Sequence, residues 1–181
     1  PALPHEIPKN LRILVIDSKA LSRQTTTQLL RECSYQVTAV KTAREGLQLL
    51  AGAEHGANFD LVLKEHEPPV ANACRLLKRM AKTEGLARTP VVVTSSQDER
   101  ETVMSCLSLG AIDYLIKPLR QNELRHIWTR VWWWRKSQGL QAPVAPAAPA
   151  HAPRHYTSFR GPSSANHQYE AASSDSKQTN W

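Results

Sequence analysis

The chain has 181 residues, a formal net charge of +7 and a hydrophobic fraction of 41%. This length allows one hydrophobic core with a segment left over, and the composition is typical of a globular protein. No apolar run approaches the roughly 20 residues of a membrane-spanning helix, and no secretory leader opens the chain. We therefore expect a cytosolic or nuclear protein with no membrane contact.

The positive charge lies mainly in the N-terminal part of the chain. Residues 1–136 carry 20 Lys and Arg against 14 Asp and Glu, a balance of +6, and residues 137–181 carry three against two, a balance of +1. Such a surplus permits contact with nucleic acid but does not require it. The cysteines, Cys33, Cys74 and Cys106, lack metal-ligand spacing and fall in apolar stretches, so we expect buried, reduced thiols.

Short apolar or β-branched runs alternate with helical patterns along residues 11–136. The runs are residues 11–16, 35–40, 61–63, 91–94 and 112–116. The third and fourth runs are apolar almost throughout, which is typical of strands buried on both faces of a parallel sheet. The alternation predicts an α/β fold, namely a doubly wound (βα)5 flavodoxin-like domain with a central five-stranded parallel sheet.

The helical patterns also predict inner faces and ends for the helices. The inner residues are expected to be Leu21, Leu29, Leu30 and Cys33; Leu47, Leu49 and Leu50; Cys74, Leu76, Leu77 and Met80; Val103, Met104, Leu107 and Leu109; and, in one last helix over residues 123–135, Leu124, Ile127, Trp128 and Val131. Thr42 with Glu45, and Ser96 with Glu99, match the reciprocal capping box that starts a helix. Gly110 is expected to end a helix in the left-handed conformation.

The composition changes after about residue 137. Residues 141–181 contain two Ile, Leu, Val or Phe residues in total and five prolines, so they offer little apolar area to offset the entropy of ordering. We predict a lead-in over residues 1–10, one folded domain over 11–136, and a disordered Pro/Ala/Ser-rich tail over 137–181.

Polar residues follow the predicted strands at the points where the apolar runs end. Asp17 and Ser18 follow the first run, Glu65 the third, Ser95 the fourth and Lys117 the fifth. In an open α/β sheet, ligands bind outside the carboxyl ends of the strands, so these side chains are expected to share one crevice. Acids, a hydroxyl and a lysine in one crevice resemble the layout of a receiver domain.

Several longer segments make the resemblance more specific. They are residues 22–24, 30–40, 60–63 with Glu65, 95–96, 106–113, and 117–124 followed by Trp128. Over about residues 11–136 the chain resembles the pseudo-response regulators of plant and green-algal circadian clocks. The resemblance implies a nuclear repressor of transcription. It also implies a basic CCT segment that contacts DNA; none is visible in this sequence, so DNA contact is expected to be indirect or made elsewhere.

The resemblance gives the crevice residues their expected roles. In receivers, acids bind a divalent metal, a central aspartate accepts a phosphoryl group, and a hydroxyl and a lysine hold its oxygens. Glu65 takes the phosphoacceptor position, Asp17 and Ser18 the metal-binding positions, and Ser95 and Lys117 the phosphoryl-contact positions.

Two departures from that pattern predict a pseudo-receiver that is not an enzyme and binds no metal or cofactor. Glu65 adds a methylene, which displaces its carboxylate by about 1.5 Å, and Ser18 removes one metal-binding charge. The alternative is a receiver that accepts a phosphoryl group in two-component signalling. Two interpretations of Glu65 stay open: a phosphate mimic touching Lys117 and Ser95, or a structural ion pair with Lys117. His66 is expected to be exposed.

A protein-interaction surface is expected on the fourth helix, last strand and last helix. Its candidates are Tyr114, Trp128, Arg130, Trp132, Trp133, Trp134 and Arg135. Because successive helical residues turn by about 100°, the three consecutive tryptophans point in different directions and at least one is expected to be exposed. Homo- or heterodimerisation and co-repressor binding are the favoured uses, and direct nucleic-acid binding by this basic helix is a further hypothesis.

Overall fold

The computed structural model describes residues 10–52, 59–67 and 72–140. Its parallel sheet has the strand order β2-β1-β3-β4-β5. The strands are β1 (Arg12–Ile16), β2 (Gln36–Val40), β3 (Leu61–Glu65), β4 (Val91–Ser95) and β5 (Ala111–Ile116). The helices are α1 (Ala20–Glu32), α2 (Ala43–Ala51), α3 (Asn72–Lys82), α4 (Arg100–Ser108), α5 (Gln121–Arg125) and α6 (Ile127–Ser137), with a short 3₁₀ turn η2 (Leu86–Arg88). The predicted α/β class, a doubly wound fold with a central five-stranded parallel sheet, is confirmed.

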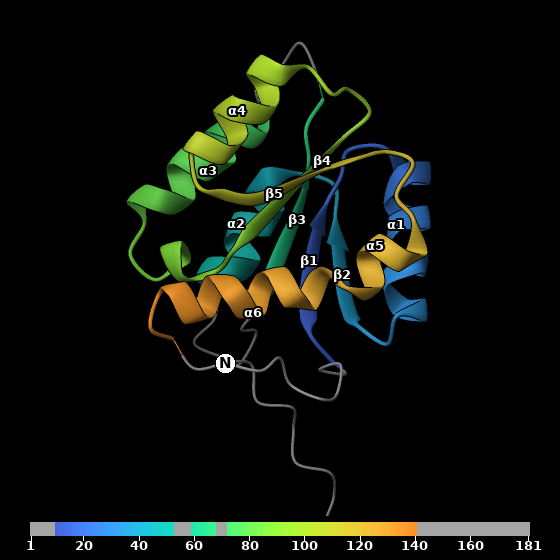
Figure 1. Ribbon diagram of the computed structural model, residues 1–181, viewed down its shortest axis with the longest axis horizontal. Coiled ribbons are helices and arrows are strands. Elements are labelled where there is room, and N and C mark those ends of the chain that lie inside the picture. Colours follow the sequence, from blue (N-terminus) through green and yellow to red (C-terminus); the bar gives the residue numbers. More distant parts are fainter. Residues whose placement is uncertain (1–9, 53–58, 68–71, 141–181) are drawn as a thin grey trace, which may run out of the picture. The chain divides into compact units, whose positions relative to one another are not determined.

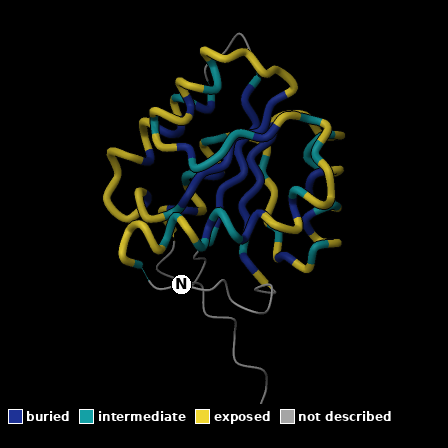
Figure 2. The backbone as a smooth tube through the Cα atoms, in the orientation of Figure 1, coloured by how far each residue is buried: buried dark blue, intermediate teal, exposed yellow. Residues whose placement is uncertain are grey.

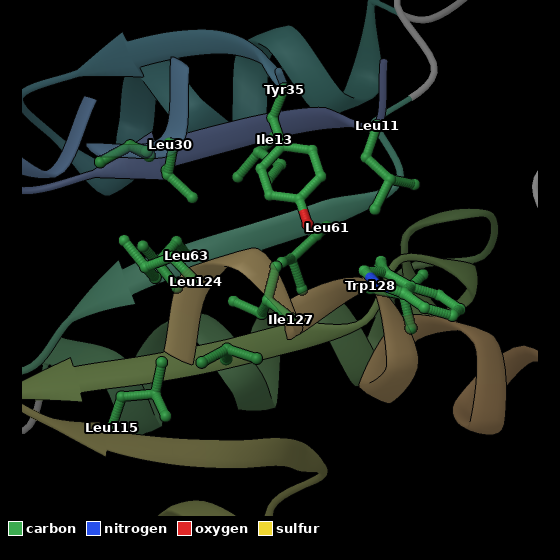
Figure 3. Packing of buried hydrophobic residues seen from close by; sticks show 13 residues of the cluster. Leu11, Ile13, Leu30, Tyr35, Leu61, Leu63, Leu115, Leu124, Ile127 and Trp128 are labelled. Atoms are coloured by element: carbon green, nitrogen blue, oxygen red, sulfur yellow. The ribbon is translucent and has the colours of Figure 1, made fainter. Parts of the chain in front are cut away.

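The sheet is covered on both faces. Helices α1, α5 and α6 pack on one face, and α2, α3 and α4 pack on the other (Figure 1). All residues of β3 and β4 are buried, which explains their uninterrupted apolar runs, and the buried strands form the centre of the domain in Figure 2. The first of the two cores includes Leu61 and Leu63 from β3 with Leu124, Ile127 and Trp128 from the last two helices (Figure 3).

The two predicted capping boxes have different outcomes. The Thr42 hydroxyl accepts the Glu45 N–H at 3.2 Å and the Glu45 carboxylate accepts the Thr42 N–H, so the start of α2 is confirmed. The second box is wrong, because α4 begins only at Arg100 and has no side-chain cap. The hydroxyl of Ser95 accepts the Gln97 N–H at 3.1 Å, and this local turn competes with helix formation directly after β4.

The last helical segment is interrupted at His126, where one continuous helix was expected. Tyr35, buried in the first core, donates its hydroxyl hydrogen to the Arg125 carbonyl at 2.9 Å. That carbonyl is thereby partnered outside the helical ladder at the end of α5, and α6 starts again at Ile127. The predicted inner residues Leu124, Ile127, Trp128 and Val131 are all buried (confirmed).

The inner faces predicted for α1, α2 and α4 are partly wrong. Leu21 is 79% exposed, Met104 58%, Leu107 38% and Leu49 37%. The buried places belong instead to small or weakly polar residues: Thr26, Thr27, Gly46 and Cys106. Gly46 shows the reason, since a Cβ at this position would overlap Ile16 Cδ1, so close packing of α2 on β1 selects for size rather than hydrophobicity.

The remaining local expectations are resolved as follows. Gly110 has a φ of 99°, as predicted for a left-handed helix stop, and Lys117–Pro118 is a cis peptide. All three cysteines are free, but only Cys106 is fully buried, and its sulfur lies 3.8 Å from that of the half-buried Cys74. No helix within the described ranges is long and apolar enough to cross a membrane. The predicted tail over residues 137–181 falls outside the described residues after Leu140.

Candidate functional site

Three charged side chains meet at the carboxyl edge of the sheet. Asp17 follows β1, Glu65 ends β3 and Lys117 follows β5. The Lys117 Nζ lies 2.6 Å from Glu65 Oε1 and 3.1 Å from Asp17 Oδ2. Both acids are buried, and the lysine side chain is 16% exposed. One ammonium group therefore bridges two buried carboxylates. The three residues lie at the edge of the sheet where the sequence predicted them.

The carboxylate of Asp17 is fully engaged. Its Oδ1 accepts the Lys19 N–H at 2.9 Å, and its Oδ2 accepts the Ser22 hydroxyl at 2.6 Å in addition to the Lys117 ion pair. Burial alone raises the pKa of this group, but hydrogen bonding outweighs it, and the pKa of Asp17 falls to about 2. The folded structure therefore favours the ionised form of Asp17.

Glu65 is less well satisfied than Asp17. Its Oε1 accepts a hydrogen bond from Lys117, whereas its buried Oε2 has no hydrogen-bond partner among the described residues. Burial and the neighbouring Asp17 carboxylate raise the pKa of Glu65, and the Lys117 ammonium opposes them only in part. The two acids thus have pKa values shifted in opposite directions, as expected where one cation serves two carboxylates.

A second set of polar contacts lies at the rim of the crevice. The Lys19 ammonium is 3.0 Å from Glu67 Oε1, and the Ser18 hydroxyl donates to Glu67 Oε2 at 3.1 Å. Hydrogen bonding to Lys19 is the main cause that lowers the pKa of Glu67, and the same contact raises the pKa of Lys19. Ser18 is therefore engaged with a residue that follows β3.

The Ser95 hydroxyl is hydrogen-bonded to the loop after β4 rather than to the Glu65 carboxylate. It is fully buried at the end of β4, and its hydroxyl accepts the Gln97 N–H. The Tyr114 hydroxyl donates to the Gln97 carbonyl at 3.1 Å and so fastens the same loop. Glu65 therefore makes the expected contact with Lys117. It makes no hydrogen bond to Ser95 among the described residues.

The sequence analysis did not assign two residues of this region to the crevice. The Ser22 hydroxyl accepts from Lys117 at 2.7 Å and donates to Asp17. Lys64 is buried and donates to the Glu65 carbonyl, and burial lowers its pKa. The signals in the sequence were a hydroxyl in the first turn after Asp17 and a lysine directly after an apolar run.

His66, expected to be exposed, is 5% exposed, so that prediction is wrong. Its backbone N–H donates to the Thr94 carbonyl at 2.7 Å, which extends the pairing of β3 with β4 by one residue and keeps His66 in the interior. Burial and the nearby Lys64 ammonium lower the pKa of the imidazole, which favours its neutral form. Its Nδ1 has no hydrogen-bond partner among the described residues.

Comparison with known proteins agrees with this geometry. The model of the response regulator receiver domain matches residues 13–129, which is most of the chain. The chain belongs to the response regulator receiver domain family. The match includes Asp17, Glu65 and Lys117, the three residues that meet at the crevice.

The curated relatives are plant proteins of the pseudo-response regulator type. The two-component response regulator-like proteins APRR1 of Arabidopsis thaliana and PRR1 of Oryza sativa are 45% and 42% identical over 130 residues. Each match covers 72% of this chain but only 21% and 25% of the relative. The Arabidopsis protein APRR9 is 40% identical over 127 residues, covering 70% of this chain and 27% of the relative. The chain thus spans about a quarter of the length of these proteins.

Solved structures share the receiver fold at lower identity. A receiver domain protein of Clostridium thermocellum has a TM-score of 0.60 at 20% identity, covering 70% of this chain and 98% of its own. The receiver domain of a sensor histidine kinase from Pseudomonas aeruginosa has a TM-score of 0.55 at 24% identity, covering 69% of this chain and 97% of its own. The latter holds a magnesium ion in its active-site cleft.

The crevice of this receiver domain does not fit a magnesium ion. Mg²⁺ prefers carboxylate oxygens and water in an octahedral arrangement. Here both oxygens of Asp17 accept hydrogen bonds, the Ser18 hydroxyl donates to Glu67, and Glu65 binds Lys117. No group of three His, Cys, Asp or Glu side chains suited to a metal occurs in the parts of the chain that the structure describes.

The predicted tryptophan surface is only partly present. Trp128 is 6% exposed and belongs to the core, so its assignment to an interaction surface is wrong. Its position on the inner face of α6, in line with Ile127 and Val131, is the physical reason. Trp132 is half-buried against the same core, Trp134 is half-buried, and Trp133 is 50% exposed.

The arginines of the same helix are engaged within the domain. Arg130 forms an ion pair with Asp113 of β5, and Arg135 pairs with Asp60, which precedes β3, at 2.8 Å. Asp60 also accepts the Arg12 N–H at 2.8 Å, so it joins α6 to the start of the sheet. These contacts leave little of the basic charge of α6 available for nucleic acid.

Proposed function

We propose that this receiver domain is a pseudo-receiver: it accepts no phosphoryl group and acts as a protein-interaction module in the regulation of transcription. The observation that carries the proposal is the 2.6 Å ion pair between Glu65 and Lys117, formed while Ser18 takes the place of a second acid. The group expected to receive phosphate and the group expected to hold it are already bound to each other.

The position of Glu65 supports the loss of phosphoryl transfer. The side chain is one methylene longer than aspartate, which moves the carboxylate by about 1.5 Å relative to an aspartate on the same backbone. Phosphoryl transfer needs in-line geometry, and a misplacement of about 1 Å can cost around 100-fold in rate. The displacement of the Glu65 carboxylate is therefore expected by itself to cause a large loss in the rate of phosphoryl transfer.

The electrostatics support the same conclusion. The acids Asp17, Glu65 and Glu67 are accompanied by the ammonium groups of Lys117 and Lys19 at 2.6 to 3.1 Å. In receivers that hold magnesium, the metal supplies positive charge for the incoming phosphoryl group. In this chain the ammonium groups of Lys19 and Lys117 supply the positive charge next to the acids. They repel a metal cation that would enter the crevice.

The similarity to plant pseudo-response regulators supports a role in clock-linked repression within the nucleus. Because the chain spans about a quarter of those relatives, DNA contact is assigned to co-repressor or partner proteins or to segments beyond this sequence. The partner-binding surface is assigned to α4, β5 and α6, where Met104, Ile116 and Trp133 are exposed. Homo- or heterodimerisation is the simplest use of that surface.

Mass spectrometry after incubation with Mg²⁺ and acetyl phosphate tests the proposal. The wild type is compared with a Glu65→Asp, Ser18→Asp variant, which restores both acids without touching Lys117. We expect no phosphoryl adduct on the wild type and an adduct on the variant. An adduct on the wild type that disappears in Glu65→Gln would overturn the proposal and establish a phosphoryl-accepting receiver. Far-ultraviolet circular dichroism of each variant serves as the folding control.

A further inference from the structure

A groove lies between α2 and α3, away from the charged crevice. It has a volume of about 710 Å³. The side chains that matter for its chemistry are Arg44, Leu47 and Gln48 from α2 and Arg75, Leu76 and Arg79 from α3. Three guanidinium groups thus border one groove, and none of the other described residues that line it is acidic.

The arginines of this groove have no side-chain partners in the part of the chain that the structure describes. Within the described ranges, no ion pair or hydrogen bond engages the side chains of Arg44, Arg75 or Arg79, and all three residues are exposed. The 11 residues of α3 include four basic and no acidic side chains. On α2, the nearby Glu45 is used as the helix cap. The positive charge at the groove is therefore uncompensated within the described structure.

The bottom of the groove is apolar. Leu76 is 2% exposed, and Leu47 packs half-buried against the same core. Ala43 and Ala51 complete the α2 side with small side chains, which leave room between the two helices. An apolar floor with a cationic rim is complementary to a segment that has apolar residues on one side and carboxylates on the other.

We propose that the α2–α3 groove binds an acidic, amphipathic segment of a partner protein. Leucine-like side chains of the segment contact Leu47, Ala43 and Ala51, and its carboxylates pair with Arg44, Arg75 and Arg79. Arginine suits this role because its guanidinium group binds carboxylates in a bidentate manner.

Two other occupants fit the groove less well. Single-stranded nucleic acid is bound by basic surfaces with aromatic side chains for base stacking, and no aromatic residue occurs among the described residues that line this groove. The chain's own residues 137–181 carry three basic residues, Arg154, Arg160 and Lys177, against two acidic ones, Glu170 and Asp175, so they lack the required negative charge. A separate acidic partner is the best match.

The α2–α3 groove shares no residue with the Glu65 crevice, and binding there goes beyond the function proposed above. It requires no phosphoryl group and no metal. A failure of peptide binding would leave the phosphotransfer result unchanged, and a phosphorylated wild type would leave the groove proposal unchanged.

Fluorescence anisotropy with the full 181-residue chain tests the groove directly. The probe is a labelled synthetic peptide of about 15 residues, long enough to form a helix, with leucines on one face and aspartates and glutamates on the other. Comparison probes are the same peptide with serine for leucine, the same peptide with lysine for the acids, and a short DNA duplex. The decisive variant is Arg75→Gln, Arg79→Gln, and the matched control is Lys78→Gln, Lys82→Gln on the same helix outside the groove.

We expect saturable binding of the acidic leucine peptide that weakens at least tenfold in the Arg75/Arg79 variant and less than twofold in the Lys78/Lys82 variant. The serine and lysine peptides are expected to bind at least tenfold more weakly. Equal weakening by both variants would mean a non-specific charge effect and overturn the proposal. Tighter binding of the DNA duplex, lost in the same arginine variant, would also overturn it in favour of a nucleic-acid site.

Discussion

The crevice around Glu65 and the groove around Arg75 are both clusters of charge, and they differ in how that charge is compensated. In the crevice, Lys117 contacts Glu65 and Asp17 at 2.6 and 3.1 Å, and the acids are buried. In the groove, the guanidinium groups of Arg75 and Arg79 are exposed and have no ion pair among the described residues. The first cluster resembles the interior of a protein, and the second resembles half of an interface.

The difference indicates where a receiver fold keeps or loses reactivity. A crevice that signals must leave an acid and a lysine free to change partners on phosphorylation. Here those groups bind each other, and under the proposed function the crevice serves as part of the folded framework. Binding is then expected at surfaces where charge is still uncompensated. The following predictions test whether the two clusters really differ in this way.

The largest expected effect comes from removing the cation of the crevice. Lys117→Met keeps an unbranched side chain one atom shorter than lysine but leaves Asp17 and Glu65 as two buried carboxylates without the Lys117 ammonium group. We expect a loss of about 3–5 kcal/mol in the free energy of unfolding by urea at neutral pH. The loss should shrink in acid, because protonation removes the unpaired charge. Lys78→Met, on the exposed face of α3, is the control, and equal losses in the two variants would contradict the account.

The second prediction concerns acid denaturation. The pKa of Asp17 is lowered from 3.8 to about 2, so its ionised form stabilises the folded state fully above about 4, and that stability disappears as the pH falls through about 2. A shift of this size corresponds to a stability change on the order of 2 kcal/mol. Urea denaturation across this pH range should show the decline in the wild type. Asp17→Asn should be less stable at neutral pH and lose less on acidification.

A smaller effect is expected for Glu65→Gln. Because the pKa of Glu65 is raised in the folded state, its ionisation destabilises the fold as the pH rises above the ordinary value of 4.5. Glutamine removes that charge and leaves Lys117 with Asp17 alone. We expect a change within about 1 kcal/mol at neutral pH, and the variant should gain relative to the wild type as the pH increases. A difference that does not vary with pH would show that Glu65 titrates normally.

The smallest effect on stability is expected at the groove. Arg75→Gln with Arg79→Gln removes two exposed like charges that have no internal partner among the described residues, so thermal unfolding at low salt should show no loss of stability. A marked decrease in the melting temperature would mean that these arginines support the fold. The two clusters would then no longer differ in kind.

The sequence predicted the alternation of strands and helices because the buried strands β3 and β4 each begin with three apolar residues and carry their polar residues at the carboxyl end. It also predicted that Asp17, Glu65 and Lys117 meet, since residues after parallel strands share one edge of the sheet. The positions of these residues directly after parallel strands are therefore enough to predict that they meet.

The details that were missed depend on tertiary contacts. Ser22 belongs to the crevice because the tertiary structure places the first turn of α1 beside Lys117. Lys64 and His66 are buried because β3 stays paired with β4 as far as His66. The inner face of α4 is formed by Cys106 rather than Met104, because the close approach of neighbouring elements favours small side chains. Hydrophobicity alone does not encode such size constraints.

The most direct test of the central claim, that internal lysines have closed the crevice to a metal ion, is calorimetric titration with Mg²⁺. The wild type and the Glu65→Asp, Ser18→Asp variant are titrated side by side at neutral pH. The account predicts only the heat of dilution for the wild type and saturable binding to the variant. Saturable binding of one Mg²⁺ to the wild type, abolished by Asp17→Asn, would contradict it.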